Sequence, residues 1–459
     1  MNAPALRRSL RPVHLVAIGM GTTIGVGWIV VTGGWVLGAG PGGAALAFLL
    51  GGLVMILVAL CYADAATHLP EASGEYGYVS SAFGPGWGFA VGWVVLLGYA
   101  GICCFEGLAL AWLLSVLVPG LAGPVLYTSL DTPVRVLDLI VVSGGAAFFT
   151  ILNVLGARES ARVQVAVTVG KMALCFAFVL LGLLGGHAAN WVPAFEPTGR
   201  AWQGMAGVLI VVPAWFCGFN ALPQALREAE RRPTTGEVAR LLAGVIALTA
   251  LFYIAVIGAT AAAAPRAALQ AAELPVVTAI EVVAGPWGGR IVLATAILAL
   301  LSAWNAALFA ASRLVHAFAE GGALWGALAR VHPRFGTPTA AVMFVGVIAL
   351  AGGLMGRGFI DPLIRLGGIG FAIAFASTCA TSLRLHWVAR APGDRRVVGA
   401  AIAGGLLLCG VIGLWLHALF APRAGWPAEA TALIGWAGIG ALLWKLGARR
   451  RRGARAAST

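Results

Sequence analysis

Two ionisable side chains stand inside long apolar stretches of this 459-residue sequence. Lys171 lies within the run 163–184, and Glu106 lies within the run 86–118. If these runs cross a membrane, each charge is costly and needs a partner or a change of protonation, so both residues are functional candidates. For Lys171, the alternative is a long side chain that reaches back to the water interface.

The chemistry open to these residues is proton or amine binding. We expect Glu106 either to neutralise a second amine on a substrate or to take a proton, and the alternative is a structural pair with a neighbouring helix. Ser302 and Asn305, in the run 290–318, are candidate polar neighbours of Lys171. Short polar side chains also join membrane helices to one another, which is the alternative for this pair. Lys171, Glu106, Ser302 and Asn305 are therefore the candidate ionisable and polar residues inside the apolar runs.

Two apolar runs contain helix breakers. Gly19–Gly27 holds four glycines in nine residues, and Pro213–Asn220 is followed by another breaker at Pro223. Glycine destabilises a helix interior by roughly 0.5–1 kcal/mol relative to alanine. Unwound backbone offers N–H groups to a carboxylate and C=O groups to an ammonium, and paired broken helices indicate a transporter binding site. The alternative is that the glycines only allow close helix packing.

The elements that must position these residues are membrane helices. The chain is 60% hydrophobic and 10% charged, whereas a soluble domain carries about 25% charged residues. No Lys, Arg, Asp or Glu occurs between Arg11 and Asp64. A spanning helix needs roughly 20 apolar residues. We predict an all-α polytopic protein of about twelve spans, near 13–37, 44–67, 86–118, 137–155, 163–184, 202–226, 238–261, 290–318, 338–355, 360–384, 398–420 and 428–446.

The basic residues give the topology. Although the net charge is +13, we exclude a nucleic-acid partner because most Lys and Arg residues collect in alternate connecting segments. This bias puts both termini in the cytoplasm of a multi-pass cell (plasma or inner) membrane protein. We also predict an interfacial helix within 320–338 and an unstructured tail after Gly447.

Enzyme chemistry has no support in the sequence. The seven Cys and seven His residues show no metal-ligand spacing, no phosphate-binding glycine motif occurs, and no nucleophile–base pair stands out. We therefore expect no enzymatic activity, no metal and no cofactor.

The chain resembles the amino acid–polyamine–organocation (APC) superfamily over almost its whole length, from about Leu10 to Trp444. Each motif is weak alone, but their order and spacing together are specific. They are IGVG at 24–27, LPEASGEY at 69–76, GFN at 218–220 with RE at 227–228, ASR at 311–313 and VHPRFGTP at 331–338.

The resemblance implies a LeuT-type core of two inverted five-helix repeats plus two helices. It also implies that the carboxylate of an amino acid meets N–H groups near Val26 and Gly27, while its ammonium meets carbonyls of both breaks. Trp215 is a possible gate, with plain packing as the alternative. The predicted substrate-binding residues are Thr22, Thr23, Gly25, Val26, Gly27, Glu106, Ala214, Trp215, Cys217, Gly218 and Asn220.

Three positions qualify the resemblance. Val26 stands where many relatives have Ser, which removes one hydroxyl contact to the carboxylate. Asn220 stands where many relatives have an acid, so the gate or proton role of that acid does not carry over. Lys171 stands where certain proton-coupled relatives have a Lys and where sodium-coupled members of the wider fold bind sodium. We therefore hypothesise that Lys171 replaces the sodium ion and carries the coupling proton. The predicted proton-coupling residues are Lys171, Glu106, Ser302 and Asn305.

We predict five regions: a cytoplasmic tail at 1–12, repeats at 13–184 and 202–390, spans 11 and 12 at 398–446, and a basic tail at 447–459. The predicted function is proton-coupled uptake of an amino acid or related small amine by alternating access. The alternative is a substrate/product exchanger, and a channel or receptor is disfavoured. The expected partners are the substrate, protons and membrane lipid, and the oligomeric state stays open.

Overall fold

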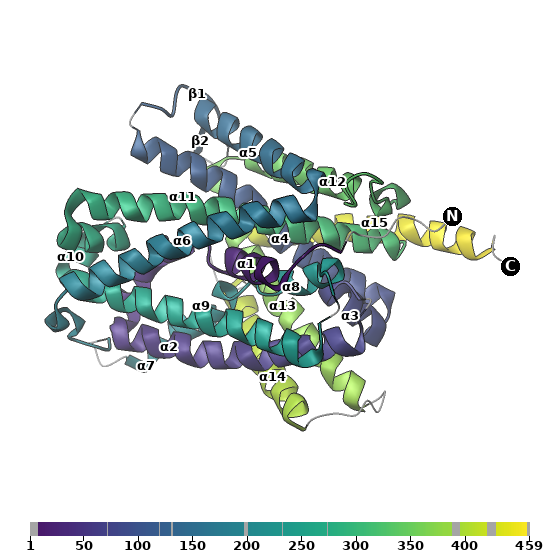
Figure 1. The fold of residues 1–459 in the computed structure, drawn as a ribbon, viewed down its shortest axis with the longest axis horizontal. Helices are drawn as coiled ribbons and strands as arrows, with labels where there is room; N and C mark the ends of the chain where they lie inside the picture. The colour runs from purple at the N-terminus through teal and green to yellow at the C-terminus, as the bar shows by residue number, and fades with distance from the viewer. Residues whose placement is uncertain are drawn as a thin grey trace.

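The computed structural model of the protein is a helical bundle, shown in Figure 1. It describes residues 8–70, 72–118, 120–129, 132–196, 201–231, 233–272, 274–387, 395–419 and 428–456. Within these residues, nine helices are long and apolar enough to cross a membrane. Helices satisfy their own backbone hydrogen bonds, which lipid cannot do for them. The predicted all-α polytopic fold is confirmed.

The first five predicted spans correspond to four helices after a short N-terminal one. The predicted turn near residues 38–43 is a break at Gly40 (φ 74°), inside a helix that covers most of spans 1 and 2. These elements are α1 (Pro12–Thr23), α2 (Gly27–His68), α4 (Pro85–Leu117), α5 (Val136–Leu155) and α6 (Ala157–Gly185).

The next five predicted spans begin with a second interrupted helix. The eighth is preceded by a helical arm that ends at Gly285 (φ 62°). The elements are α7 (Ala201–Trp215), α8 (Ala221–Ala225), η2 (Leu226–Glu228), α9 (Thr235–Ala263), α11 (Pro275–Glu320), α12 (Thr339–Gly353) and α13 (Ile360–Trp387). The last two spans are α14 (Arg395–Leu419) and α15 (Ala428–Ala456).

Two local predictions are wrong. The interfacial segment holds only a single 3₁₀ turn, η3 (Gly326–Ala329), because Leu324 and Leu328 turn inward and are buried. The tail after Gly447 continues α15 as helix to Ala456 instead of being unstructured.

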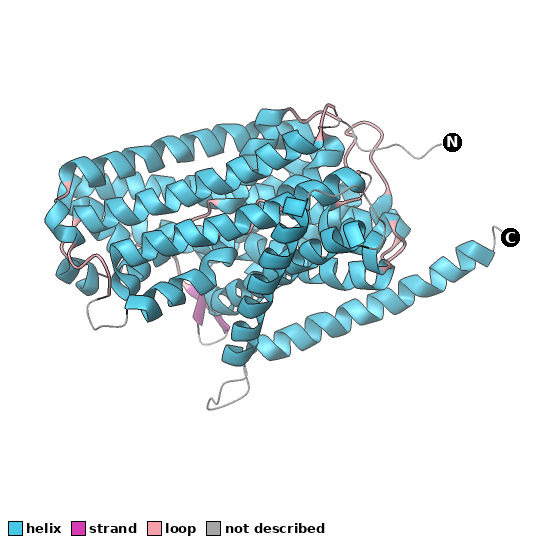
Figure 2. Cartoon of the chain, turned by 90° about the horizontal axis from the view of Figure 1, so that it is seen from below, coloured by secondary structure: helices cyan, strands magenta, loops and turns pink. Residues whose placement is uncertain are grey.

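Several short elements connect the spans. A hairpin of β1 (Val125–Ser129) and β2 (Thr132–Arg135), visible in Figure 2, precedes α5 and was not predicted. The others are α3 (Gly74–Phe83), η1 (Ala188–Trp191), α10 (Arg266–Ala271) and η4 (Arg357–Phe359).

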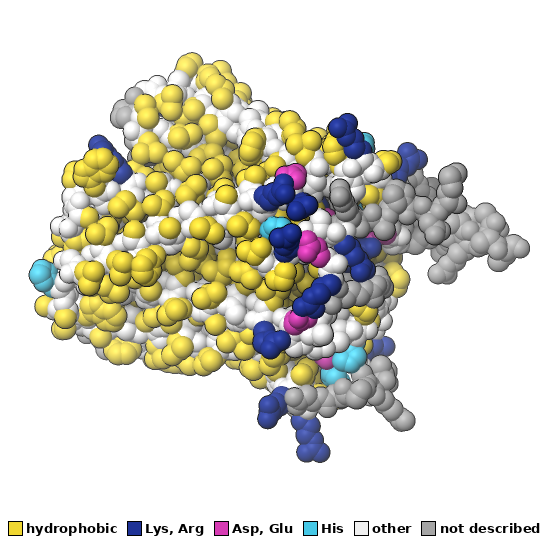
Figure 3. Space-filling model, viewed as in Figure 1, with side chains coloured by type: hydrophobic (Ala, Val, Ile, Leu, Met, Phe, Trp, Pro, Cys, Tyr) yellow, Lys and Arg dark blue, Asp and Glu magenta, His cyan; other side chains and the backbone are white. Residues whose placement is uncertain are grey.

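The helices pack in the way a membrane bundle requires. α2 runs beside α9 and α7, α6 beside α11, and α4 beside α11 and α13. Large apolar side chains such as Phe176 and Leu184 remain exposed on the outside. Figure 3 shows apolar side chains over most of the visible face and charged ones in a band toward the end where both termini lie. The apolar belt is the lipid-facing surface.

Candidate substrate and coupling site

The first helix break separates α1 from α2. α1 ends at Thr23 and α2 begins at Gly27, so Ile24–Val26 lies outside both helices. Among the described residues, no backbone group accepts a hydrogen bond from the N–H groups of Gly25, Val26 or Gly27. These free N–H groups stand at the start of a long helix, whose dipole favours an anion.

The second break lies beside the first. α7 ends at Trp215, and α8 begins at Ala221. Gly218 has φ 114°, and a Cβ atom on it would come within 2.6 Å of the Thr22 carbonyl carbon. The close approach of the two unwound backbones therefore requires glycine at this position.

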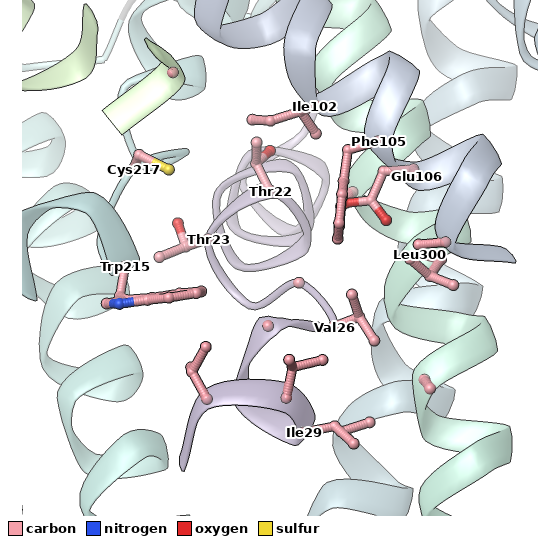
Figure 4. Close-up of a pocket in the computed structure, with 18 of the residues that line it drawn as sticks. Thr22, Thr23, Val26, Ile29, Ile102, Phe105, Glu106, Trp215, Cys217 and Leu300 are labelled. Atoms are coloured by element: carbon pink, nitrogen blue, oxygen red, sulfur yellow. The ribbon is translucent and has the colours of Figure 1, made fainter. Parts of the chain in front are cut away.

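A cavity of about 330 Å³ opens between the two breaks and α4. In Figure 4, Thr22 and Thr23 end α1 at the centre, with Trp215 and Cys217 on one side and Phe105 and Glu106 on the other. The predicted binding residues that line the cavity are Thr22, Thr23, Gly25, Val26, Gly27, Glu106, Trp215 and Cys217.

Two predicted binding residues, Gly218 and Asn220, do not line it. Gly218 packs against Thr22, and Asn220 turns toward α3. Ala214 is a helical residue of α7, and its side chain lies outside the described residues. Sequence reasoning missed the apolar walls of the cavity, among them Ile102, Trp112, Tyr253, Leu300 and Phe371. Nothing in the apolar pattern distinguishes such walls from ordinary core.

The walls leave one acid in a mainly apolar space. Glu106 is 3% exposed, and its Oε2 atom has no hydrogen-bond partner among the described residues. A buried carboxylate oxygen without a donor is costly unless a ligand or a proton satisfies it. Among the described residues, no hydrogen bond or ion pair joins Glu106 to a neighbouring helix, although it interacts electrostatically with Lys171 of α6.

The two threonine hydroxyls already donate within α1. Thr22 Oγ1 donates to the carbonyl of Ile18, and Thr23 Oγ1 donates to the carbonyl of Gly19, both at 2.7 Å. Their oxygen lone pairs remain available, so each hydroxyl can accept a hydrogen bond from an ammonium.

Trp215 covers the first break. A Cβ atom on Gly27 would clash with the Trp215 ring, so the indole lies directly against the start of α2. The ring is held by an edge contact with Trp35, at 5.4 Å between centroids. This position suits a gate over the cavity, because the indole lines the cavity and also contacts α2 at Gly27 and Trp35.

Lys171 is fully buried on α6 and is bonded to the first break. Its Nζ donates to the carbonyls of Ile24 at 2.6 Å and Gly21 at 3.4 Å, and to Ser302 Oγ at 3.2 Å. The side chain points to the unwound segment, which excludes snorkelling to the interface. Three oxygens around one buried cation resemble the surroundings of a bound metal cation.

The two predicted neighbours of Lys171 differ. Ser302 contacts it directly, whereas Asn305 bonds to Asn153, Ser160 and Gln164. Gln164 Nε2 also donates to Ser302 Oγ at 2.9 Å, which links the two groups. Sequence reasoning missed Gln164 and Thr168, although their spacing with Lys171 places all three on one face of α6.

Asn220 belongs to a second buried polar cluster. Its Oδ1 accepts the N–H of Gly218 at 3.0 Å, and its Nδ2 donates to Glu75 Oε1 at 2.7 Å. Tyr62 and Gln224 also donate to Glu75, at 2.8 and 3.0 Å. Glu75 was not predicted as a site residue.

Ion pairs close the end of the bundle near the termini. Arg313 binds Glu228 at 2.6 and 3.2 Å, with both side chains at most 2% exposed. Arg227 binds Glu320 at 2.7 Å in a more exposed position. The Glu228 carbonyl also accepts the N–H groups of Ser9 and Leu10, which ties the N-terminal segment to this end. Among the described residues, no group of three His, Cys, Asp or Glu side chains is arranged to hold a metal ion.

Comparison with known proteins agrees with this architecture. Amino-acid permease RocE of Bacillus subtilis is 28% identical over 360 residues, which is 76% of this chain and 73% of that protein. The methylthioribose transporter of Bacillus subtilis is 27% identical over 384 residues, 80% of this chain and 79% of that protein. Branched-chain amino acid permease BcaP of Bacillus subtilis is 27% identical over 383 residues, 81% and 79% of the two chains. The profile of the family described as "Amino acid permease" matches residues 10–442, so the chain belongs to the amino acid permease family.

Proposed function

We propose that the protein carries an amino acid or related small amine into the cell by proton-coupled alternating access. The substrate carboxylate meets the free N–H groups of Gly25, Val26 and Gly27, and its ammonium meets carbonyls of the two breaks. Glu106 takes a second amine of the substrate or a proton. The family and the names of the relatives support an amino acid as substrate.

The observation that carries the coupling proposal is the buried ammonium of Lys171. It holds the carbonyls of Gly21 and Ile24 where the substrate-binding N–H groups begin. Loss of its proton removes the charge and one of its three donors, which weakens the hydrogen bonds to the Gly21 and Ile24 carbonyls of the unwound segment. Proton binding and the shape of the substrate site are therefore linked through one short segment.

Replacing Lys171 tests this proposal. We expect Lys171→Met in proteoliposomes to reduce uptake of L-leucine or L-arginine driven by an inward proton gradient by roughly tenfold or more, because two carbonyls lose a charged donor. The only other lysine, Lys445, is exposed on α15, so Lys445→Met is the matched control. Undiminished gradient-driven uptake by Lys171→Met would exclude the coupling role.

An exchanger is the second candidate. Uptake into empty vesicles separates the two, because an exchanger accumulates labelled L-leucine or L-arginine only when the vesicles are loaded with unlabelled substrate. A proton symporter instead concentrates it into empty vesicles when the outside is acidic. The proposed arrangement in the cell places both termini in the cytoplasm of the plasma or inner membrane, as the basic residues predict.

A further inference from the structure

Glu75 is a buried acid that the proposed transport cycle does not use. It lies in the first turn of α3, before the third predicted span, and its exposed fraction is 0%. Its three side-chain donors, Tyr62, Asn220 and Gln224, are all neutral. Among the described residues, no Lys, Arg or His side chain donates to it. A buried charge is normally paired, so this carboxyl group has an unusual position.

The charged groups on the surrounding elements have other partners. Three tyrosines interact electrostatically with Glu75, namely Tyr62 of α2, Tyr78 of α3 itself and Tyr99 of α4. The elements packed against α3 also carry charged or titratable side chains, among them Asp64 and His68 of α2, Arg313, His316 and Glu320 of α11, and Arg384 and His386 of α13.

Arg313 is bonded to Glu228, and Arg384 lies over the ring of Phe83. His386 contacts Asp64. Arg227 reaches Ser73, two residues before Glu75, and turns to Glu320. Tyr62 is thus the one titratable side chain among them that is hydrogen-bonded to the Glu75 carboxylate.

The unpaired Oε1 atom of Gln224 is a second observation that favours protonation of Glu75. Gln224 Nε2 donates to Glu75 Oε2, which leaves its own Oε1 buried without a partner among the described residues. A protonated Glu75 has an O–H to donate, and a rotated Gln224 amide then accepts it through Oε1. Protonation therefore satisfies the Gln224 Oε1 acceptor and replaces the bond from Nε2 to the carboxylate by a bond from the carboxyl O–H to Oε1.

Glu75 is linked to the substrate site through the second break. Asn220 joins Glu75 to the N–H of Gly218, and Gly218 packs on the backbone of Thr22 and Thr23 at the cavity. Gln224 adds a bond from α8. The ionised carboxylate thus holds both the break and α8 onto α3 by charge-assisted bonds, which are about twice as strong as neutral ones.

We propose that Glu75 is a second proton-binding site, separate from Lys171, whose loading weakens the attachment of α8 and its preceding break to α3. The proton comes from water and adds to the carboxylate, and no other bond is made or broken. The site binds a proton whether or not the protein is a symporter, and only its effect on transport rests on the proposed function. Burial raises the pKa of Glu75, and its hydrogen bonds from Asn220, Tyr62 and Gln224 limit the rise.

Infrared difference spectra of the purified full-length protein test the site without a substrate. All variants are made in a Glu106→Gln background, which removes the signal of the other buried acid with an unsatisfied oxygen. As the pH is raised, we expect the carbonyl stretch of one protonated carboxyl group to disappear, at a pH above that of an ordinary Glu. Glu75→Gln should lack this signal, and Glu159→Gln, which changes a half-exposed acid, should keep it. The same titrating signal in Glu75→Gln would overturn the proposal, as would a Glu75 that never protonates above the usual Glu range.

A double variant that moves the carboxyl group from position 75 to position 220 distinguishes proton binding from a purely structural role of Glu75. In Glu75→Gln with Asn220→Asp, the carboxyl group moves across the 2.7 Å hydrogen bond between the two side chains. We expect a titrating carboxyl signal to return in this double variant. If neither this variant nor Glu75→Asp shows it while both fold, position 75 is not a proton site. Gradient-driven uptake is measured separately, so the infrared result for Glu75 can be interpreted even if the symport proposal fails.

Discussion

At the residue scale, the cavity pairs free backbone donors with one unsatisfied acid. The N–H groups of Gly25, Val26 and Gly27 have no backbone acceptors among the described residues, and Glu106 Oε2 has no donor. Such groups are complementary to a zwitterion that carries a further amine. The rest of the lining is mainly apolar, so in the proposed function these few groups would set the orientation of the substrate.

Glu106 should therefore select for a cationic side chain. We expect Glu106→Gln to weaken L-arginine binding by roughly tenfold to a hundredfold, as loss of a charged hydrogen bond of about 1.5–3 kcal/mol implies, and to change L-leucine binding little. The measurement is the ligand-induced rise in unfolding temperature in detergent at matched ligand concentrations. Equal losses for the two ligands, or none for either, would contradict a role in selection.

At the element scale, the two breaks work as one unit. α1, α2, α7 and α8 all end or begin within the region around Gly218 and Thr22, and their backbones approach too closely for any side chain at position 218. Lys171 from α6 and Asn220 from the second break then fix the unwound segments from either side. We therefore expect movement of one segment to displace the other.

Gly218→Ala tests this contact. The positive φ and the clash with the Thr22 backbone should destabilise the protein by about 1–3 kcal/mol and strongly reduce uptake. Gly207→Ala is the control, because Gly207 is an exposed helical residue of α7 with open space at its Cβ position. We expect a lower unfolding temperature in Gly218→Ala but not in Gly207→Ala. Equal unfolding temperatures would show that the close contact between the two breaks is not needed for stability.

At the scale of the whole molecule, the end near the termini is closed by ion pairs. Arg313 and Glu228 are buried, and the N-terminal segment hydrogen-bonds to the Glu228 backbone. The cavity lies on the other side of this closure, between the breaks and the far ends of α4 and α11. In the proposed alternating access this closure has to open, and its ion pairs would then break.

Breaking the buried pair should be costly in the closed state. We expect Arg313→Met to destabilise the protein by about 3–5 kcal/mol, because Glu228 is left buried without a partner. Arg313→Met with Glu228→Gln should recover part of the loss, since no uncompensated charge remains. The measurement is the unfolding temperature in detergent, with Arg162→Met of the exposed Arg162–Glu159 pair as the control. If the single and double variants are equally unstable, packing and not charge dominates at this end.

Stability should also depend on pH through Glu75. Its pKa is raised in the folded protein, so folding favours the protonated form and the stability contribution is present at low pH. It is lost as the pH rises from the ordinary Glu range through the raised folded value. We expect the unfolding temperature to fall over that window in the wild type and less in Glu75→Gln.

The sequence by itself determined the membrane class, the order of the helices and the places where two of them break. Hydropathy, charge and helix breakers act through neighbouring residues and the surrounding lipid, so they can be read along the chain. That is why 13–37 and 202–226 were predicted as interrupted spans and were found interrupted. The short interfacial segment and the C-terminal tail were misjudged, because burial against other helices and continuation of α15 are not local properties.

Only the tertiary structure decided which polar groups meet. Lys171 and the Ile24 carbonyl are 147 residues apart, and Asn220 and Glu75 are 145 residues apart. A lone Lys or Glu in an apolar run predicts that a polar partner exists, but it does not predict which residue that is, because helix packing determines which side chains meet. The same packing decided that Asn220 turns to α3 instead of the cavity, and that Glu106 has an oxygen free for a ligand.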